Sequence, residues 1–575
     1  MLLRNVGNEK QQERARLNRM EIIDAKLSRR DLIRYGLLAA GGMLVAKSGL
    51  SIRASGAATL VSPRTTPWAE PLPIPQPLQP NTSFDLSKLS AGLNGDSSEA
   101  PRASHQLWDY YKPRKFYEIE EKQRTWSFHK DLPTQPIWNF QGDSDDSAHY
   151  AEPTLHARYG EPIVVRNKNN LPANHKGYGI PDTSTHLHNA HNASESDGNP
   201  SDYYGSGYYK DFHYCNKLAN DDPNEALGFL WFHDHRLDYT AQNVYRGLVG
   251  TYILYDELDC NDETNVNGFR LPSGEYDVPL VFGDKVFNSN GIAYYDLFAL
   301  DGIIGDKQTV NGKIQPFFDV KKRRYRLRLL NTGPSRFLSF KFSNNMPFWQ
   351  ISNDGNLLPK PIKRTSINLT VAERVDIIVD FNSATGSDVF LMNVLEHIDG
   401  TGPTGKILNP GTPLLKFNLG PTAADGSINP DQIDKLRGLP VMDTVINKTR
   451  TWIFNRQNGA WSVNGQLFNR NIVNAKCKLG TAEIWNFENG GGGWSHPIHM
   501  HYEEFRILSR NGVAVKPGDV EYARKDVIWL HPGEKVKVYV KFRDFTGKYP
   551  LHCHNVVHED HAMMARYDIV DGPAS

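Results

Sequence analysis

The sequence contains little sulfur and has no excess of either charge. Its 575 residues include only four Cys and nine Met, and 65 Lys and Arg balance 65 Asp and Glu. A formal charge of zero gives no indication of a nucleic-acid partner or of binding to an acidic membrane surface. After a short apolar stretch at residues 37–46, no segment is apolar enough to span a bilayer. We therefore expect no stable membrane anchor.

Histidines, by contrast, gather in four short groups. These are His186-Leu187-His188, Trp231-Phe232-His233-Asp234-His235, His496-Pro497-Ile498-His499-Met500-His501, and His552-Cys553-His554 with His558 and His561 after it. In an extended segment, two histidines separated by one residue point to the same face, roughly 7 Å apart at Cα. A single pair of this kind is commonly two unrelated surface or core histidines. Four groups, one with a Cys between its histidines, indicate metal binding.

The last group has the most informative residue order. Side chains alternate faces along a strand, so His552 and His554 point one way while Cys553 points the other. A Cys with two His and a weakly bound Met is the ligand set of an electron-transfer copper site. Met563 and Met564 follow shortly afterwards, and strand periodicity alone does not choose between them. The alternation predicts that one strand serves two metal sites, one on each of its faces.

These motifs resemble those of the multicopper oxidases, in particular the group that contains bilirubin oxidases and the bacterial spore-coat laccase. The points of resemblance are Trp231–His235 followed by Asn243-Val244-Tyr245-Arg246-Gly247, then Trp494–His499, then His558-Glu559-Asp560-His561 before Met563. All four histidine groups occur in the family's order, so the resemblance covers essentially the whole chain after its leader. It implies four copper ions, one in a mononuclear blue site and three in a trinuclear cluster.

The resemblance also assigns ligands to each copper. The blue copper takes a Cys, two His and an axial Met, with Met563 favoured over Met564: His496, Cys553, His558 and Met563. The lone copper of the cluster takes two histidines, His186 and His499. The coupled pair of coppers takes six: His188, His233, His235, His501, His552 and His554. We interpret His191 and His561 as neighbours of ligands or surface residues. Asn189 departs from the pattern, because many laccases have Gly there.

Three further residues are candidates for roles in catalysis. Acids at the positions of Glu559 and Asp197 lie on the proton path in the spore-coat laccase pattern. The alternative role for both acids is to orient ligand imidazoles. Trp494 precedes His496 by two residues, as in bilirubin oxidases, so we expect it beside the blue copper. It is either part of the electron-entry surface or a packed aromatic at the rim.

Internal repeats predict the architecture. The segment 372–381 matches 533–542 in charge and apolar alternation, and Val310-Asn311-Gly312-Lys313 echoes Val463-Asn464-Gly465-Gln466. Together with the length, the repeats predict an all-β chain of three consecutive cupredoxin-like Greek-key β-sandwich domains. We place these domains at residues 59–270, 271–440 and 441–575. The middle copy has an apolar segment, 390–395, where the third has His552-Cys553-His554, so we interpret it as a spacer without copper ligands.

The N-terminal segment 1–58 resembles a twin-arginine signal peptide. Ser28-Arg29-Arg30-Asp31-Leu32-Ile33 precedes the apolar stretch, and small residues at 54–58 offer a cleavage site. The alternative is a charged amphipathic helix with a chance Arg pair. The signal predicts that the bacterial twin-arginine export machinery delivers the protein to the periplasm or outside the cell. In that oxidising space Cys215 and Cys260 could form a disulfide, although pairing of either with Cys477 stays open.

The resemblance and the electron count together predict the reaction. Reduction of O2 to two waters takes four electrons, and four coppers can store one each. We expect electron donors to be phenols, aromatic amines or tetrapyrroles such as bilirubin. The runner-up is a metallo-oxidase acting on Mn(II), Cu(I) or Fe(II), although no Met-rich insertion is present to capture Cu(I). A non-enzymatic scaffold would have lost copper ligands, and a copper nitrite reductase lacks the His-Cys-His order; this chain fits neither class.

Overall fold

The computed structural model describes residues 61–142, 150–297, 299–457 and 460–575, so the predicted signal segment 1–58 lies outside it. Strands dominate these residues, and the two α-helices among them are short, α3 (Thr240–Arg246) and α4 (Val556–Asp560). The prediction of an all-β chain is confirmed. Within the described ranges, no helix combines the length and apolar character that crossing a membrane requires.

The first sandwich consists of two four-stranded sheets. One has the order β2 (Gln135–Gly142), β1 (Lys115–Trp126), β4 (Ile163–Asn169), β8 (Tyr209–Tyr214). The other has the order β3 (Thr154–Arg158), β10 (Val249–Tyr255), β9 (Phe229–Asp234), β6 (Thr185–His188). A small ribbon pairs β5 (Asp182–Thr183) with β7 (Tyr204–Gly205). The strands β6 and β9 pair in register, which places His186 opposite His233.

The second sandwich repeats this plan with longer sheets. The first sheet runs β14 (Lys313–Ile314), β13 (Lys307–Val310), β11 (Asp277–Phe287), β16 (Arg324–Asn331), β21 (Arg374–Asp380), β18 (Phe348–Asn353), β19 (Asn356–Arg364), with β12 (Ala293–Tyr294) beside β11. The second sheet runs β15 (Phe317–Lys322), β23 (Ile407–Thr422), β22 (Asp388–Leu395), β17 (Leu338–Phe342), β20 (Ser366–Leu369).

The third sandwich also consists of two sheets. Its first sheet runs β25 (Ala460–Val463), β24 (Ile446–Gln457), β27 (Ala482–Asn489), β33 (Lys535–Lys541), β29 (Phe505–Arg510), β30 (Val513–Ala514), with β31 (Arg524–Lys525) beside β29. Its second sheet runs β26 (Ala475–Lys478), β35 (Met564–Val570), β34 (Gly547–Cys553), β28 (His496–Met500), β32 (Val527–Leu530).

The sequence repeats coincide with structural equivalents. In each sandwich the first sheet contains one parallel strand pair, β1 with β4, β11 with β16, and β24 with β27. The two Asn-Gly echoes are both tight turns with positive φ, at 47° and 75° for Asn311 and Gly312 and at 53° and 72° for Asn464 and Gly465. Asn and Gly are the residues that tolerate this left-handed backbone. The apolar segment 390–395 lies in β22, which occupies the same place in its sheet order as β34.

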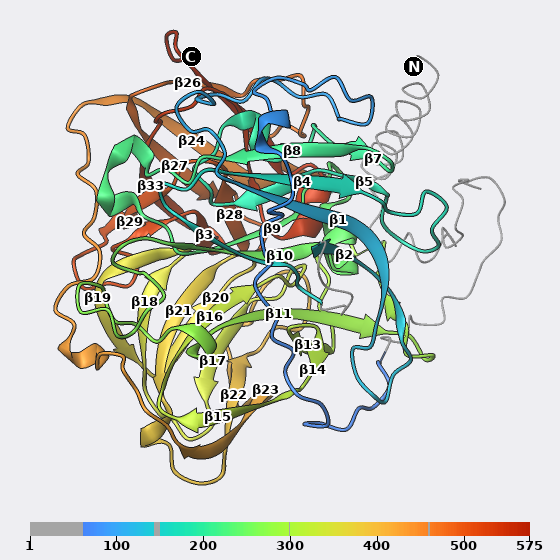
Figure 1. Cartoon of the computed structure of the whole chain (residues 1–575), viewed down its shortest axis with the longest axis vertical. Coiled ribbons are helices and arrows are strands. Elements are labelled where there is room, and N and C mark those ends of the chain that lie inside the picture. Colours follow the sequence, from blue (N-terminus) through green and yellow to red (C-terminus); the bar gives the residue numbers. More distant parts are fainter. Residues whose placement is uncertain (1–60, 143–149, 298, 458–459) are drawn as a thin grey trace.

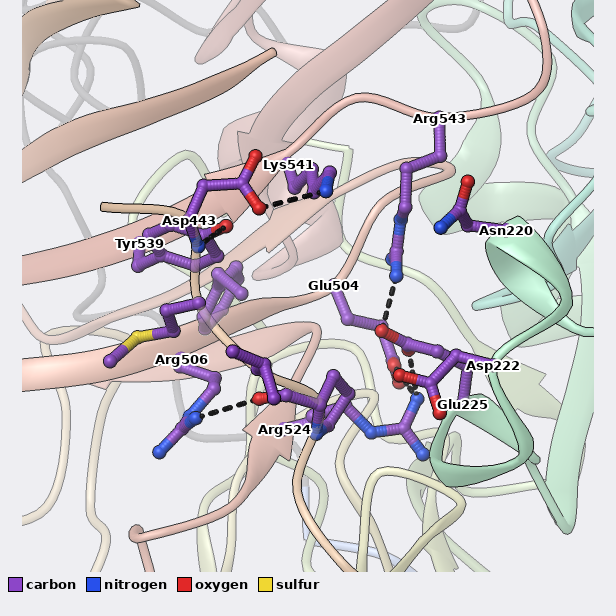
Figure 2. A pocket seen from close by; sticks show the side chains of 14 residues that line it. Asn220, Asp222, Glu225, Asp443, Glu504, Arg506, Arg524, Tyr539, Lys541 and Arg543 are labelled. Carbon is purple, nitrogen blue, oxygen red and sulfur yellow. Dashed lines mark hydrogen bonds and ion pairs between the residues drawn. The ribbon is translucent and has the colours of Figure 1, made fainter. Parts of the chain in front are cut away.

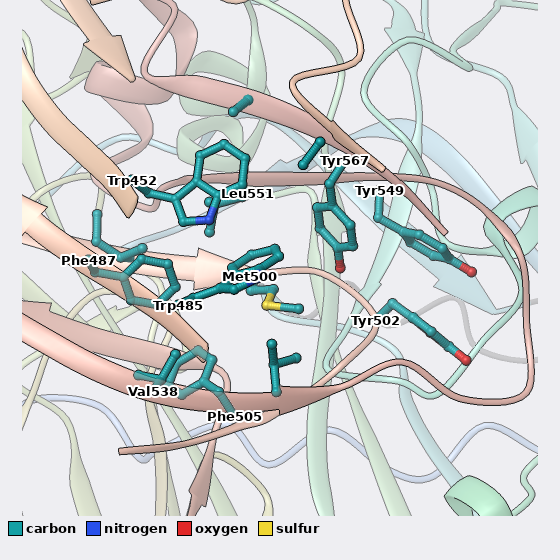
Figure 3. Close-up of a cluster of buried hydrophobic side chains, with 14 of the residues drawn as sticks. Trp452, Trp485, Phe487, Met500, Tyr502, Phe505, Val538, Tyr549, Leu551 and Tyr567 are labelled. Carbon is teal, nitrogen blue, oxygen red and sulfur yellow. The ribbon is translucent and has the colours of Figure 1, made fainter. Parts of the chain in front are cut away.

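Each sandwich encloses its own hydrophobic core. Figure 3 shows the core of the third, where Trp485 from β27 faces Tyr567 from β35 and Tyr549 from β34 at its edge. The tyrosine rings of 549 and 567 stack at 5.9 Å, and Trp485 meets Tyr567 edge-on at 5.4 Å. In Figure 1 the second sandwich lies below the other two, and the strands of the first and third lie side by side above it. The close packing fixes β34 rigidly against β28.

All four cysteines are free thiols. Cys215, Cys260 and Cys477, whose pairing the sequence leaves open, therefore form no disulfide with one another in this structure. Cys215 is buried against the core of the third sandwich. Cys260 lies in a loop, where its sulfur accepts a hydrogen bond from the Asn265 side chain at 3.4 Å.

Candidate metal centre

The strand β34 and the turn after it bring the first set of predicted ligands together. The Sγ atom of Cys553 lies 3.5 Å from His496 Nδ1 and 3.6 Å from His558 Nδ1. The two Nδ1 atoms are 3.3 Å apart. His496 comes from β28 and His558 from α4, so three separate segments converge on one point. One thiol and two imidazole nitrogens at these distances make a site for a single soft metal ion.

The register of β34 separates the two neighbouring methionines. Met564 pairs with His552 across β34 and β35, so its side chain lies on the His552 face of the sheet. Met563, one residue earlier, is fully buried, belongs to the same core as Cys553, and its carbonyl accepts the Cys553 N–H at 3.1 Å. The register therefore favours Met563 for the thiol side of the strand, in agreement with the resemblance.

The second set consists of eight histidines that face one another between the first and third sandwiches. All are at most 1% exposed: His186, His188, His233, His235, His499, His501, His552 and His554. The ring of His186 stacks on that of His501 at 3.7 Å, and His188 stacks on His499 at 3.7 Å. Each stack joins one ring from the first sandwich to one from the third. The site thus lies in the interface between these two sandwiches.

Within this cage the histidines form overlapping groups. The Nε2 atoms of His235, His501 and His552 lie 3.1–3.3 Å from one another. The rings of His188, His233 and His554 are separated by 5.2–5.9 Å. The remaining two, His186 and His499, have ring centroids 5.8 Å apart. Donor atoms within 4.8 Å of one another also occur in the sets His186-His188-His233 and His186-His499-His501, so the cage offers overlapping places for more than one ion.

Hydrogen bonds at the outer nitrogens explain why the inner ones point into the cage. His186 Nδ1 faces the Asp197 carbonyl at 2.5 Å, His233 Nδ1 the Asp234 carbonyl at 2.9 Å, and His499 Nδ1 the Asp526 carbonyl at 2.9 Å. Each ring then keeps Nε2 free. The Nε2 atoms of these three rings are buried without a hydrogen-bond partner among the described residues. Buried unpaired nitrogens are costly, so the cage is built for something that binds them.

The protonation states of these side chains also fit a bound metal ion. Burial lowers the pKa of His496 and of His233 to about 3, and it lowers the pKa of His501 and His554 well below the usual value. These imidazoles are neutral, which is the metal-binding form. Burial raises the pKa of the Cys553 thiol, so its thiolate requires a cation beside it. The donor set therefore fits copper at both sites.

Two buried acids contact the cage. Glu559, on α4, has one carboxylate oxygen 3.2 Å from His235 Nδ1 and the other 3.1 Å from His552 Nδ1. Asp197 Oδ2 lies 2.9 Å from His501 Nδ1, and burial raises the Asp197 pKa well above the usual range. Both predicted acids therefore lie against ligand rings. The carboxylate of Asp234, the residue between His233 and His235, accepts hydrogen bonds from Ser184 N and from Asn243, each at 2.8 Å.

Trp494 lies near the thiol site but does not pack directly on its ligands. Trp461 stacks on the ring of His558 at 3.7 Å, and Trp494 meets Trp461 edge-on at 5.4 Å. Trp461 is 1% exposed, whereas Trp494 is partly exposed. No sequence motif pointed to Trp461, because this residue lies in β25, outside all four histidine groups. The tryptophan in contact with the site is thus the one that motif reasoning missed.

The other histidines near ligands have separate partners. His191 Nε2 lies 2.8 Å from Asp544 Oδ2 and stacks on Tyr502 at 4.8 Å. His561 Nδ1 lies 2.5 Å from the Val557 carbonyl at the end of α4. A third acid, Asp526, also reaches the cage, at 2.9 Å from His188 Nε2, and was not predicted. In the sequence, Asp526 stands out only because it lies between Arg524-Lys525 and an apolar strand.

A cavity of about 270 Å³ lies near this interface but contains none of the predicted ligands (Figure 2). Most of its charged side chains are paired with one another, while Arg506 donates to the Pro440 carbonyl and Asp222 accepts from Asn224 N. Arg524 lies 2.6 Å from Glu225 and 2.7 Å from Glu504, and Lys541 lies 2.9 Å from Asp443. Ion pairs that satisfy each other leave little affinity for a ligand. We interpret this cavity as part of the seam between sandwiches.

Comparisons with known proteins agree with this geometry. The family model "Multicopper oxidase" matches residues 286–409, and a second model of the same description matches residues 439–573. Bilirubin oxidase of Albifimbria verrucaria is 31% identical over 525 residues, which cover 88% of this chain and 82% of that protein. Laccase of Bacillus subtilis (strain 168) is 30% identical over 518 residues, covering 80% and 95%.

Solved structures show the same fold. A laccase from Pediococcus acidilactici aligns with a TM-score of 0.69 at 24% identity and covers 88% of this chain and 95% of its own. A Campylobacter jejuni multicopper oxidase, titled a metallo-oxidase, aligns with a TM-score of 0.67 at 19% identity, covering 89% and 97%. On the identity and coverage of its curated relatives, the chain belongs to the multicopper oxidase family and is a copper-dependent oxidoreductase.

Proposed function

We propose that this enzyme takes electrons singly from phenolic, aromatic amine or tetrapyrrole donors and uses them to reduce O2 to water with four copper ions. The observation that carries the proposal is the position of one strand. Cys553 faces His496 and His558, while its neighbour His552 lies among His235 and His501. When bound, copper supplies one-electron storage at each site, and three neighbouring ions supply the place where O2 is reduced.

We assign the ligands as the sequence predicts. Met563 joins the two histidines and the thiol at the mononuclear site. In the cluster, the group His235, His501 and His552 supports one copper of the coupled pair. The resemblance assigns the rest of that pair's ligands, His188, His233 and His554, and gives His186 and His499 to the lone copper. The Cys553 backbone joins both of its histidine neighbours through covalent bonds alone. Electrons therefore need no jump through space between the two sites.

Glu559 and Asp197 are proposed to deliver protons during oxygen reduction. Both carboxyl groups are buried at the cage wall and contact Nδ1 atoms of ligand rings rather than the Nε2 atoms that face inwards. A carboxyl group in that place can hold a proton beside the cluster and orient the ring at the same time. Solvent is otherwise excluded, because every ring of the cage is at most 1% exposed.

The electron-entry surface is proposed to lie over Trp461 and Trp494. The Arg456 guanidinium lies 4.9 Å from the Trp461 ring centre and 5.0 Å from that of Trp494, and it forms an ion pair with Asp301. His558 Nε2 lies 3.0 Å from the Asp301 carbonyl, so this segment leads directly to a ligand ring. An aromatic surface of this kind suits flat aromatic donors, tetrapyrroles included. The named activity of the Albifimbria relative supports the same class.

We also propose the domain boundaries and the export route. The last strand of the first sandwich ends at Tyr255 and the next sandwich begins at Asp277, while β23 ends at Thr422 and β24 begins at Ile446. These intervals support boundaries near 270 and 440. The sequence Ser28–Ile33 supports delivery to the periplasm or the cell exterior by the twin-arginine machinery.

One set of assays tests the function. Purified enzyme is analysed for copper per chain and visible absorption, and oxygen uptake is recorded with a phenol, an aromatic amine, bilirubin, Mn(II), Fe(II) and Cu(I). We expect four coppers, a blue band and uptake with the organic donors. Cys553→Ser should lose the blue band and turnover together. Uptake with metal ions alone would favour the metallo-oxidase, and a colourless protein without stoichiometric copper would refute the proposal.

A further inference from the structure

We infer that the second sandwich, which contributes no copper ligand, positions the trinuclear site through Arg374 and Asp354, which hold the Asp526 carboxylate against two ligand rings. The inference rests on the proposed copper assignment and goes beyond it. It gives the second sandwich a role other than that of a spacer.

Asp526 contacts one ligand from each side of the interface. Its Oδ2 atom lies 2.9 Å from His188 Nε2, in the first sandwich, and 3.6 Å from His499 Nδ1, in the third. Its backbone carbonyl also accepts from His499 Nδ1 at 2.9 Å. Asp526 is fully buried. Because the same residue contacts both stacked rings, its position sets the angle at which each ring faces the cage.

A carboxylate in this place needs a counter-ion, and the second sandwich supplies it. Arg374, at the start of β21, places NH1 2.8 Å from one oxygen of Asp526 and 3.1 Å from the other. Arg374 is fully buried as well. Buried charged groups are tolerated when they are paired and hydrogen-bonded, so the two contacts from the guanidinium hold the Asp526 side chain in place. The contact crosses from the second sandwich to the third.

Asp354 fixes both members of this ion pair. It lies in the tight turn between β18 and β19, with φ of 46°, followed by Gly355 at 84°. Its carboxylate accepts from the backbone N–H of Arg374 at 3.2 Å and of Asp526 at 3.2 Å. Its carbonyl accepts from Arg374 NH2 at 2.9 Å. One turn of the second sandwich therefore holds the arginine and the carboxylate in register.

The same turn also holds the loop that follows His188. Asn189 has a φ of 69° and donates from Nδ2 to the Asp354 carbonyl at 2.8 Å. It donates again to Glu504 at 2.7 Å. This gives a role to the residue that departs from the Gly of many laccases. Asn tolerates the left-handed backbone, and its amide ties the His188 loop to the second sandwich.

A purely structural ion pair is the competing explanation, and the chain offers a matched control. Arg328, on the neighbouring strand β16, is also fully buried, with Nε 2.6 Å from Asp277 and NH1 3.1 Å from Asp376. In the described part of the chain, neither of these two acids lies within ion-pair distance of a predicted copper ligand. Removing Arg328 therefore costs a buried ion pair of the same kind without reaching the cage.

The test compares Arg374→Met and Arg374→Lys with Arg328→Met and Arg328→Lys in the full-length, copper-loaded enzyme. The readouts are copper per chain, the visible blue band, the EPR spectrum and the thermal midpoint. Copper uptake by the metal-free protein is titrated as well. Loss of a residue that orients metal ligands typically weakens metal binding about 10–100-fold. We expect that loss at the cluster in Arg374→Met, with the blue band unchanged.

The outcomes separate the explanations. Support consists of a changed non-blue EPR signal or reduced cluster copper in the Arg374 variants, partial recovery in Arg374→Lys, and wild-type copper and EPR in the Arg328 variants despite a lower thermal midpoint. Wild-type copper and EPR in Arg374→Met, or equal changes in both arginine series, would overturn the inference. If Arg374→Met does not fold, Arg374→Lys and Asp354→Asn decide by the same readouts. Fewer than four coppers in the unmodified enzyme would instead refute the proposed function.

Discussion

At the scale of single residues, the site depends on which nitrogen of each histidine is already bonded. Backbone carbonyls bind Nδ1 of His186, His233 and His499, and this leaves Nε2 free to face the cage. The carboxylates of Glu559 and Asp197 do the same for other rings. Ligand direction is thus set by partners that are themselves held by the fold.

Glu559→Gln should separate oxygen reduction from donor oxidation. The amide keeps the size of the side chain but cannot deliver a proton, so we expect oxygen reduction to slow about 100-fold or more. Reduction of the blue site by the donor, followed by stopped-flow absorption, should change little. The control is Asp234→Asn, which alters a buried acid between two ligands that bonds Ser184 and Asn243 rather than a ligand ring. Equal slowing of both half-reactions would argue that Glu559 only orients rings.

Sequence reasoning proposed the candidate ligands, which the structure brings together, and missed the residues that contact them, for a physical reason. A ligand must be His, Cys or Met, and its spacing along a strand is local, so His552-Cys553-His554 can be read directly. Trp461, Asp526 and Arg374 contact or support the rings from other segments of the chain, outside the histidine groups. Their contacts exist only after the sandwiches dock. The question whether Cys215 pairs with Cys260 stayed open for the same reason, since a shared domain does not place two thiols side by side.

At the scale of elements, strand register determines which side chains share a face. The pairing of β6 with β9 puts His186 opposite His233, and the pairing of β28 with β34 puts His499 opposite His552. A slip of one residue would turn each ligand to the other face.

Hydroxyl groups from β5, β6 and β7 meet a buried acid on β1, Glu121. It accepts from Thr183, from Thr185 at 3.0 Å and from Tyr204 at 3.1 Å.

Glu121 should make the stability of the first sandwich depend on pH. Burial raises its pKa from 4.5 to about 7, despite the three hydroxyl donors. Between these values the folded state binds more protons than the unfolded state, so the free energy of unfolding falls as pH rises. The shift corresponds to at most about 3 kcal/mol. We expect Glu121→Gln to gain thermal stability relative to wild type as pH increases from about 5 to about 7.5.

Glu118→Gln on the same strand is the control for that measurement. Glu118 pairs with Lys168 near the surface and should not alter the pH dependence. Midpoints of thermal unfolding across the pH range give the comparison. A Glu121→Gln enzyme whose midpoint runs parallel to wild type at every pH would mean that this carboxyl group does not titrate in the folded protein between those limits.

The fold itself was largely predictable at this scale. The repeats at 372–381 and 533–542 fall on β21 and β33, and the two Asn-Gly echoes form equivalent tight turns. Alternating apolar residues specify half-buried strands because one face must enter the core. The order of strands within each sheet was not predictable from that pattern, since it depends on pairing between distant segments such as β24 with β27.

At the scale of the whole molecule, the cage joins the first and third sandwiches, and the second braces both. His186, His188, His233 and His235 come from one side, and His499, His501, His552 and His554 from the other. Metal that binds both sets at once stabilises the docked arrangement, because the unfolded chain cannot present all eight rings together. Copper is therefore expected to act as a clamp between sandwiches.

Removing copper should lower thermal stability. Each site contributes about 2.7 kcal/mol when free copper is 100-fold above its dissociation constant. Calorimetry of the enzyme before and after treatment with a copper chelator should show a lower midpoint, with recovery after copper is added back. The first and third sandwiches should also unfold less cooperatively without metal. An unchanged midpoint in copper-free protein would show that the interface is held by protein contacts alone.

The most direct test of the account is a crystal structure of the copper-loaded enzyme with anomalous scattering measured at the copper edge. The account predicts four peaks: one beside Cys553 Sγ, within bonding distance of His496 and His558, and three inside the cage of eight histidines. No peak beside the thiol, or fewer than three in the cage of fully loaded enzyme, would contradict it.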